Sequence, residues 1–290
     1  MKNWSISQKK VVTFLTLTLM GSSVLYYLII SSGSLESMGG LWVLLLMWTP
    51  GLSGIITQLF YEHSLRGMGW KPGKVKYLLL AYFIPLLYCL VVYGLTWLSG
   101  LGLFPSTEFV ESLKMAYGSQ MPDALLILIY VAMSGTLGML GSLLSAVGEE
   151  IGWRGLFVPE LAKLTSFQNT ALISGAVWAA WHLPLILFSD YNLPGMPKWY
   201  AAVMFIVMVM GISFAFAWLR LKSGSLWTAA LLHASHNLFV QGVFTPLTQR
   251  IAVTPYIIDE FGVGLALAAV VLAVIFWRKS AELPAVMQKV

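Results

Sequence analysis

The chain has 290 residues, of which 58% are hydrophobic and only 10% are charged. A mean hydropathy of +0.80 excludes an ordinary soluble domain and indicates a polytopic membrane protein. The net charge of +5 does not indicate a nucleic-acid partner, because the positions of lysine and arginine in a membrane protein report its topology. We therefore expect one all-α integral membrane domain over residues 1–290, with the bilayer as its surroundings and no nucleic acid bound.

Eight apolar windows are long enough to cross a bilayer. They lie at about 11–30, 41–60, 77–98, 124–147, 170–189, 199–219, 225–244 and 262–277. The first window is longer than the core of a typical signal peptide, so we interpret it as a retained span. The sequence predicts a polytopic helix bundle of about eight transmembrane helices.

Lysine and arginine are unevenly distributed between the two sides of these windows. With a cytoplasmic N-terminus, all but three of the 17 fall on the cytoplasmic side, including Lys2 and Lys289 at the two ends. The three exceptions are Lys114, Lys198 and Arg250. This positive-inside bias predicts that both termini are cytoplasmic, in what we expect to be the plasma membrane.

Cys89 is the only cysteine and lies within an apolar window. The chain therefore forms no internal disulfide and no cysteine-based metal cluster. We expect Cys89 to be a buried structural residue.

The stretch SAVGEEIGWRGLFVP, residues 145–159, places three ionisable side chains in apolar sequence. Such groups are costly in a membrane and often mark functional sites. Helical spacing puts Glu150 and Arg154 at i, i+4, where they can pair, whereas Glu149 points about 100° away around the helix. Glu149 is thus the carboxylate free for chemistry. The alternative is an interfacial salt bridge with one solvated glutamate at a helix end.

Two later windows also carry polar side chains. His182 lies deep in the fifth, and His233 and Asn237 lie at i, i+4 in the seventh, with His236 close to their face. A rise of about 1.5 Å per residue puts His233 and Asn237 about 10–16 Å deep, but Glu149 near the cytoplasmic boundary. Polar groups at such depth need a water-filled cavity, which we expect to open toward the cytoplasmic side.

A carboxylate, two imidazoles and an amide are the parts needed to activate water and to stabilise an oxyanion. The alternative is a set of unrelated buried polar residues that only hydrogen-bond across helices.

The order and spacing of these residues resemble the CPBP family of CAAX-protease and bacteriocin-processing intramembrane endopeptidases. The family pattern is EExxxR, then FxxxH, then HxxxN. It is matched here by Glu149, Glu150 and Arg154, then Trp178 and His182, then His233 and Asn237. Trp178 in place of phenylalanine is the one departure. The motifs lie in a core of about 124–244.

The resemblance implies that Glu149 and His182 activate a water while His233 and Asn237 stabilise the oxyanion. Glu150 and Arg154 would support them, and His236 has no role in the family pattern. Substrates would be membrane-associated proteins or peptides, namely prenylated CAAX-type tails in some members and bacteriocin leaders or signalling proteins in others. The sequence leaves the oligomeric state open.

Metal dependence is a separate question, because members of the family are often called metalloproteases. A catalytic zinc needs three protein ligands and an open position, which Glu149, His182 and His233 could supply. However, Asn237 is a poor zinc ligand and a good oxyanion donor, and a zinc-protease HExxH motif is absent. We therefore expect a metal-free glutamate mechanism, with one divalent metal, zinc, as the alternative.

Two other classes stay open. Gly51-Leu52-Ser53-Gly54 matches the rhomboid GxSG motif, so a rhomboid-like serine protease could use Ser53 as nucleophile. The motif order argues against this, since HxxxN precedes GxSG in rhomboids, and the two glycines fit close helix packing. The second class is a non-proteolytic protein of the immunity or abortive-infection type, or a transporter, although no inverted repeat supports transport.

Overall fold

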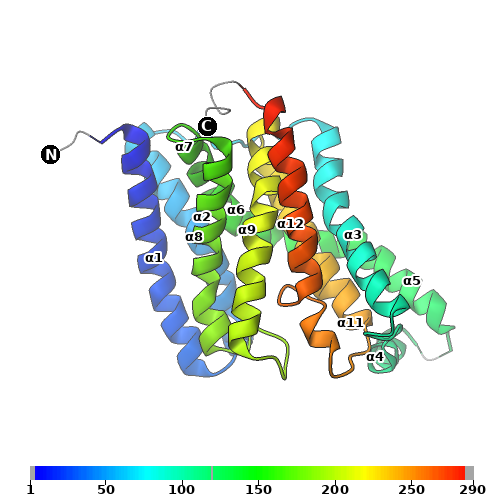
Figure 1. Cartoon of the computed structure of the whole chain (residues 1–290). Helices are drawn as coiled ribbons and strands as arrows, with labels where there is room; N and C mark the ends of the chain where they lie inside the picture. The colour runs from blue at the N-terminus through cyan, green and yellow to red at the C-terminus, as the bar shows by residue number, and fades with distance from the viewer. Residues whose placement is uncertain (1–3, 119, 285–290) are drawn as a thin grey trace.

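A computed structural model describes residues 4–118 and 120–284, so Lys2 and Lys289 lie outside the described residues. Within these ranges the chain is helical, and its only β-type pairing is an isolated bridge between Leu103 and Gln249. The predicted all-α membrane helix bundle is confirmed (Figure 1).

Seven helical segments in the described chain are long and apolar enough to cross a membrane. Six of them are built on α1 (Ile6–Ser32), α2 (Leu41–Glu62), α3 (Val75–Leu98), α8 (Phe167–Phe188), α9 (Lys198–Ser223) and α12 (Val263–Arg278). The seventh, Asp123–Ala162, joins α5 (Asp123–Met133), η2 (Ser134–Gly138), α6 (Met139–Glu150), η3 (Ile151–Phe157) and α7 (Val158–Ala162). A short helix, α4 (Thr107–Tyr117), precedes it. Most of α9 is buried, because α8 and α12 both pack on it.

The predicted window 225–244 is not among these seven, and it carries several polar side chains. It is helical nonetheless, through α10 (Leu226–Asn237), η4 (Leu238–Phe244) and α11 (Thr245–Leu247). Within residues 4–118 and 120–284 the chain therefore traverses the bundle eight times, and α1 begins at the same end at which α12 finishes (Figure 1). We call this end, which carries Lys10, Arg66, Lys71, Arg220 and Lys222, the basic end.

The fourth long helix differs from its predicted extent. The apolar window ended at 147, but the helix continues to Ala162. Glu149 therefore lies inside a continuous helix and not at the bundle boundary, as its predicted depth had implied. The charged side chains do not end the helix because Glu150 and Arg154 are buried and paired with each other.

The closest helix contact in this region is between α2 and the junction of α6 with η3. A Cβ atom on Gly51 would lie 2.3 Å from the carbonyl oxygen of Gly148, and one on Gly152 would lie 2.3 Å from that of Pro50. Only glycine permits this approach. The GLSG motif thus packs two helices together, and it holds the helix that bears Glu149 against α2.

Alanine at Gly152 is therefore expected to destabilise the fold, because its methyl group overlaps the Pro50 carbonyl. Overpacking of this kind costs about 1–3 kcal/mol, which should lower the melting temperature in detergent by several degrees. Gly141→Ala is the matched control, since a Cβ there meets nothing within 4 Å. Equal melting temperatures for the two variants would contradict this account of the α2 contact.

We propose that the basic end is cytoplasmic, on the strength of the positive-inside bias. Cysteines introduced singly at exposed Glu36 and Glu108, at the opposite end, are expected to react with an impermeant thiol reagent added outside intact cells. A cysteine at exposed Lys71 should not react. Cys89, which is fully buried, is replaced beforehand to remove background. Labelling at 71 but not at 36 or 108 would reverse the orientation.

Candidate active site

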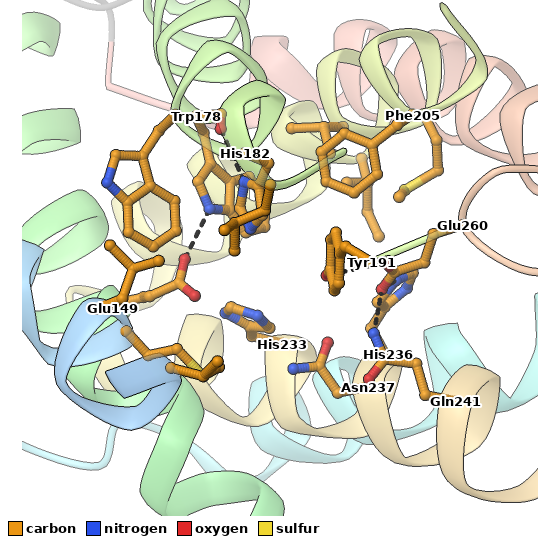
Figure 2. Close-up of a pocket in the computed structure, with 18 of the residues that line it drawn as sticks. Glu149, Trp178, His182, Tyr191, Phe205, His233, His236, Asn237, Gln241 and Glu260 are labelled. Carbon is orange, nitrogen blue, oxygen red and sulfur yellow. Dashed lines mark hydrogen bonds and ion pairs between the residues drawn. The ribbon is translucent and has the colours of Figure 1, made fainter. Parts of the chain in front are cut away.

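Four of the residues predicted to form the site meet at one cavity of about 160 Å³. Glu149 reaches it from α6, His182 from α8, and His233 and Asn237 from α10 (Figure 2). Its remaining wall is largely apolar and includes Leu46, Met47, Leu185, Phe205, Met208, Val209, Ile212 and Phe216. The helices thus place a carboxylate, two imidazoles and an amide around one cavity.

Glu149 is 1% exposed, and it is anchored by a residue of another helix. The indole Nε1–H of Trp178 donates a hydrogen bond of 2.8 Å to Oε2 of Glu149. This interaction leaves Oε1 for other partners in the cavity. Trp178 stands where the family pattern has phenylalanine, and the substitution supplies a donor that phenylalanine lacks.

Both histidine rings are held through Nδ1. In His182 this nitrogen lies 2.9 Å from the carbonyl oxygen of Trp178, and because a carbonyl only accepts, His182 Nδ1 carries the proton. In His233 it lies 3.0 Å from Oε1 of Glu150, a carboxylate oxygen that also accepts. In each ring Nε2 is therefore the nitrogen left for chemistry.

Glu150 and Arg154 do not line the cavity, although the predicted pair between them is confirmed. Nη1 of Arg154 donates to Oε1 of Glu150 at 2.7 Å, and both side chains are at most 1% exposed. The guanidinium carbon lies 4.1 Å from the Trp178 ring centroid and 4.0 Å from that of Phe216. The pair therefore acts on the site through other residues, since Glu150 holds His233 and Arg154 packs on Trp178.

Asn237 lies one helical turn after His233 and is half-buried. Figure 2 shows its carboxamide directed into the cavity beside the His233 ring. An amide in this position can present an N–H group to an oxygen bound in the cavity.

A second polar wall of the cavity was not predicted from the sequence, although His236 was placed close to the face of His233 and Asn237. Its members are His236, Gln241 and Glu260, with Tyr191 above them (Figure 2). Gln241 continues the i, i+4 series of His233 and Asn237, a signal that the sequence offered. Glu260 lies in the loop before α12, and no periodicity in the sequence could have placed it beside α10.

The cavity lies toward the end opposite the basic end, and an opening toward the cytoplasmic side stays a prediction. Within the described chain, its lining includes no residue of the loops at the basic end. Tyr191 and Glu260 come instead from loops at the opposite end. The buried Glu150–Arg154 pair lies outside the cavity and packs against Trp178 and Phe216, two of its lining residues.

The alternative zinc site was tested against this geometry. Each histidine has Nδ1 bonded to an acceptor and Nε2 free, which is typical of zinc-binding histidines. However, the described residues contain no group of three or more His, Cys, Asp or Glu side chains placed to hold a metal ion. The metal-free mechanism stays a prediction.

Comparison with known proteins agrees with the geometry. A family model described as type II CAAX prenyl endopeptidase Rce1-like matches residues 125–239. This segment contains all four predicted catalytic residues together with the Glu150–Arg154 pair. The match supports the resemblance of this chain to the CPBP, or CAAX protease, family. Gln241 and Glu260 lie outside the segment that the family model matches.

A curated protein similar to this chain is CAAX prenyl protease 2 of Methanococcus maripaludis. The two are 33% identical over 101 residues, which amount to 33% of this chain and 36% of the relative. The alignment thus spans about a third of the relative's length, and the relative's activity does not by itself define that of this chain.

Proposed function

We propose that this protein is an intramembrane endopeptidase that hydrolyses peptide bonds in membrane-associated proteins or peptides. The observation that carries the proposal is the meeting of Glu149, His182, His233 and Asn237 from three helices at one buried cavity. The family-model match and the name of the similar protein from Methanococcus maripaludis support the same reaction class.

In this mechanism Glu149 is the general base. Trp178 holds one carboxylate oxygen, so the other can take a proton from a water placed between Glu149 and the substrate carbonyl. His182 presents Nε2 as an acceptor and orients the same water. The protonated Glu149 then returns its proton to the departing amine, which balances the reaction.

Asn237 and His233 stabilise the oxyanion. The Asn237 amide donates an N–H to the oxyanion. A protonated His233 ring donates to it through Nε2–H, while the Nδ1–H of the same ring stays hydrogen-bonded to Glu150. The Glu150 carboxylate favours that protonated ring, as an adjacent opposite charge does. Glu150 and Arg154 therefore act through His233 without touching the substrate.

The proposed function is tested by trapping substrate peptides on an inactive variant. The Glu149→Gln variant, expressed in its native membrane and purified, should retain uncleaved membrane peptides that mass spectrometry identifies. The unmodified protein should then cleave synthetic copies of these peptides at one internal bond. A protein that binds peptides and leaves them intact would instead support the non-proteolytic immunity-type class.

Activity is expected to survive prolonged treatment with a strong chelator, because the proposed steps use only side chains of this chain. Elemental analysis of the purified enzyme should give well under one zinc per chain, as the ligand geometry above leads us to expect. Stoichiometric metal, with activity lost on chelation and restored by zinc, would make Glu149, His182 and His233 ligands instead.

A further inference from the structure

The second polar wall of the cavity is built around Glu260. Oε1 of Glu260 lies 3.0 Å from Nε2 of His236 and accepts a 2.8 Å hydrogen bond from Nε2 of Gln241. Its Oε2 accepts a hydrogen bond of 3.3 Å from the Tyr191 hydroxyl. The carboxylate is 4% exposed and lines the cavity that holds Glu149. The mechanism above makes no use of it.

Three donors around one carboxylate favour its ionised form. Nε2 of His236 lies within hydrogen-bonding distance of Glu260, and the Tyr88 hydroxyl lies against Nδ1 of the same ring. Burial raises the pKa of Glu260, but the hydrogen bond and charge of His236, the charge of His182 and the hydrogen bond from Gln241 outweigh it and leave the pKa below its ordinary value. The neighbouring Asp259 has a pKa raised to about 7 by burial and by the charge of Glu260. Of the two carboxyl groups, Glu260 is therefore the one that carries the negative charge.

No lysine or arginine of the described chain lines the cavity to balance this charge. The buried Arg154 is already paired with Glu150, on the other side of Glu149. The cavity that Glu149 and Glu260 share is also lined by apolar side chains such as Phe205, Met208 and Ile212. An apolar wall beside a hydrogen-bonded carboxylate complements a long apolar stem with a cationic tip.

We propose that Glu260, held by His236, Gln241 and Tyr191, forms a subsite that binds the cationic side chain of a lysine or arginine in the substrate peptide. The proposal rests on the proposed function and adds the substrate class. It also implies that a free C-terminal carboxylate is a poor occupant of this end of the cavity, because it would face Glu260 with no cation beside it.

A binding experiment tests the subsite without requiring hydrolysis. Benzamidine and benzamide have nearly the same shape and differ in charge, and their affinities for the full-length protein in detergent can be measured by calorimetry. We expect benzamidine to bind about tenfold or more tightly than benzamide, as a charge-assisted hydrogen bond provides. The preference should fall below about twofold in Glu260→Gln and persist in Glu149→Gln.

Equal binding of the two probes by the unmodified protein would overturn the proposal, and this comparison needs no variant to fold. Loss of the preference in Glu149→Gln with retention in Glu260→Gln would also overturn it, because the anion that binds cations would then be Glu149.

A second experiment separates this inference from the proposed function. Fluorogenic peptides that carry lysine or the uncharged norleucine, scanned through each position around the scissile bond, are given to the protein and to Glu260→Gln. We expect a lysine preference of about tenfold in kcat/KM at one position, lost in Glu260→Gln, with the norleucine peptide cleaved equally by both. Equal cleavage of lysine and norleucine peptides throughout, abolished by Glu149→Gln, would uphold the protease and reject the subsite. Benzamidine selectivity without cleavage of any peptide would uphold the subsite and reject the protease.

Discussion

Glutamine in place of Glu149 is expected to lower kcat by about 10²–10⁴-fold, the contribution typical of a general base. The substitution keeps the shape of the side chain, and its amide oxygen can still accept the bond from Trp178. The melting temperature in detergent should therefore change little. Hydrolysis of a peptide identified by trapping, followed under single-turnover conditions, measures the loss directly.

Ser53→Ala is the matched control for this prediction. Ser53 is 4% exposed on α2, within the GLSG segment that packs against the fourth helix, and it does not line the cavity. Its alanine variant should keep near-normal activity, whereas His182→Ala, His233→Ala and Asn237→Ala should all be strongly impaired. An inactive Ser53→Ala together with an active Glu149→Gln would establish a rhomboid-like serine mechanism instead.

The parts of this site that the sequence predicted are those fixed by local geometry. The i, i+4 pairing of Glu150 with Arg154 follows from helical spacing alone, and it is present although that turn is a π-helix. The shared face of His233 and Asn237 follows in the same way. That these residues meet Glu149 and His182 was predicted only by combining depth with a family resemblance, since spacing says nothing about which helices are neighbours.

What the sequence did not predict depends on packing between distant segments. The fourth helix is longer than its apolar window because the Glu150–Arg154 pair satisfies itself inside the bundle. The shorter window had placed Glu149 at the bundle boundary. Glu260 was not predicted as a site residue because it belongs to a loop. Only the folded chain shows that His236 lies within hydrogen-bonding distance of it.

Removing the charge of Arg154 is expected to lower the stability of the folded protein strongly. Arg154→Met leaves the Glu150 carboxylate fully buried without its cation, and breaking a buried pair in this way costs about 3–5 kcal/mol. We expect the variant to lose most of its folded fraction, measured by size-exclusion chromatography and thermal unfolding in detergent. Arg66→Met, at an exposed position of the basic end, should behave like the unmodified protein.

The double variant Glu150→Gln, Arg154→Met separates the effect of the ion pair on stability from its effect on catalysis. Replacing both charges removes the unpaired carboxylate, so much of the lost stability should return, as it does when a buried ion pair is exchanged for neutral groups of similar size. Activity should not return with it, because His233 would face an amide in place of the carboxylate that favours its protonated ring. Recovery of kcat together with stability would show that the pair only holds the helices, whereas recovery of stability alone would show that Glu150 positions and charges His233 for the oxyanion.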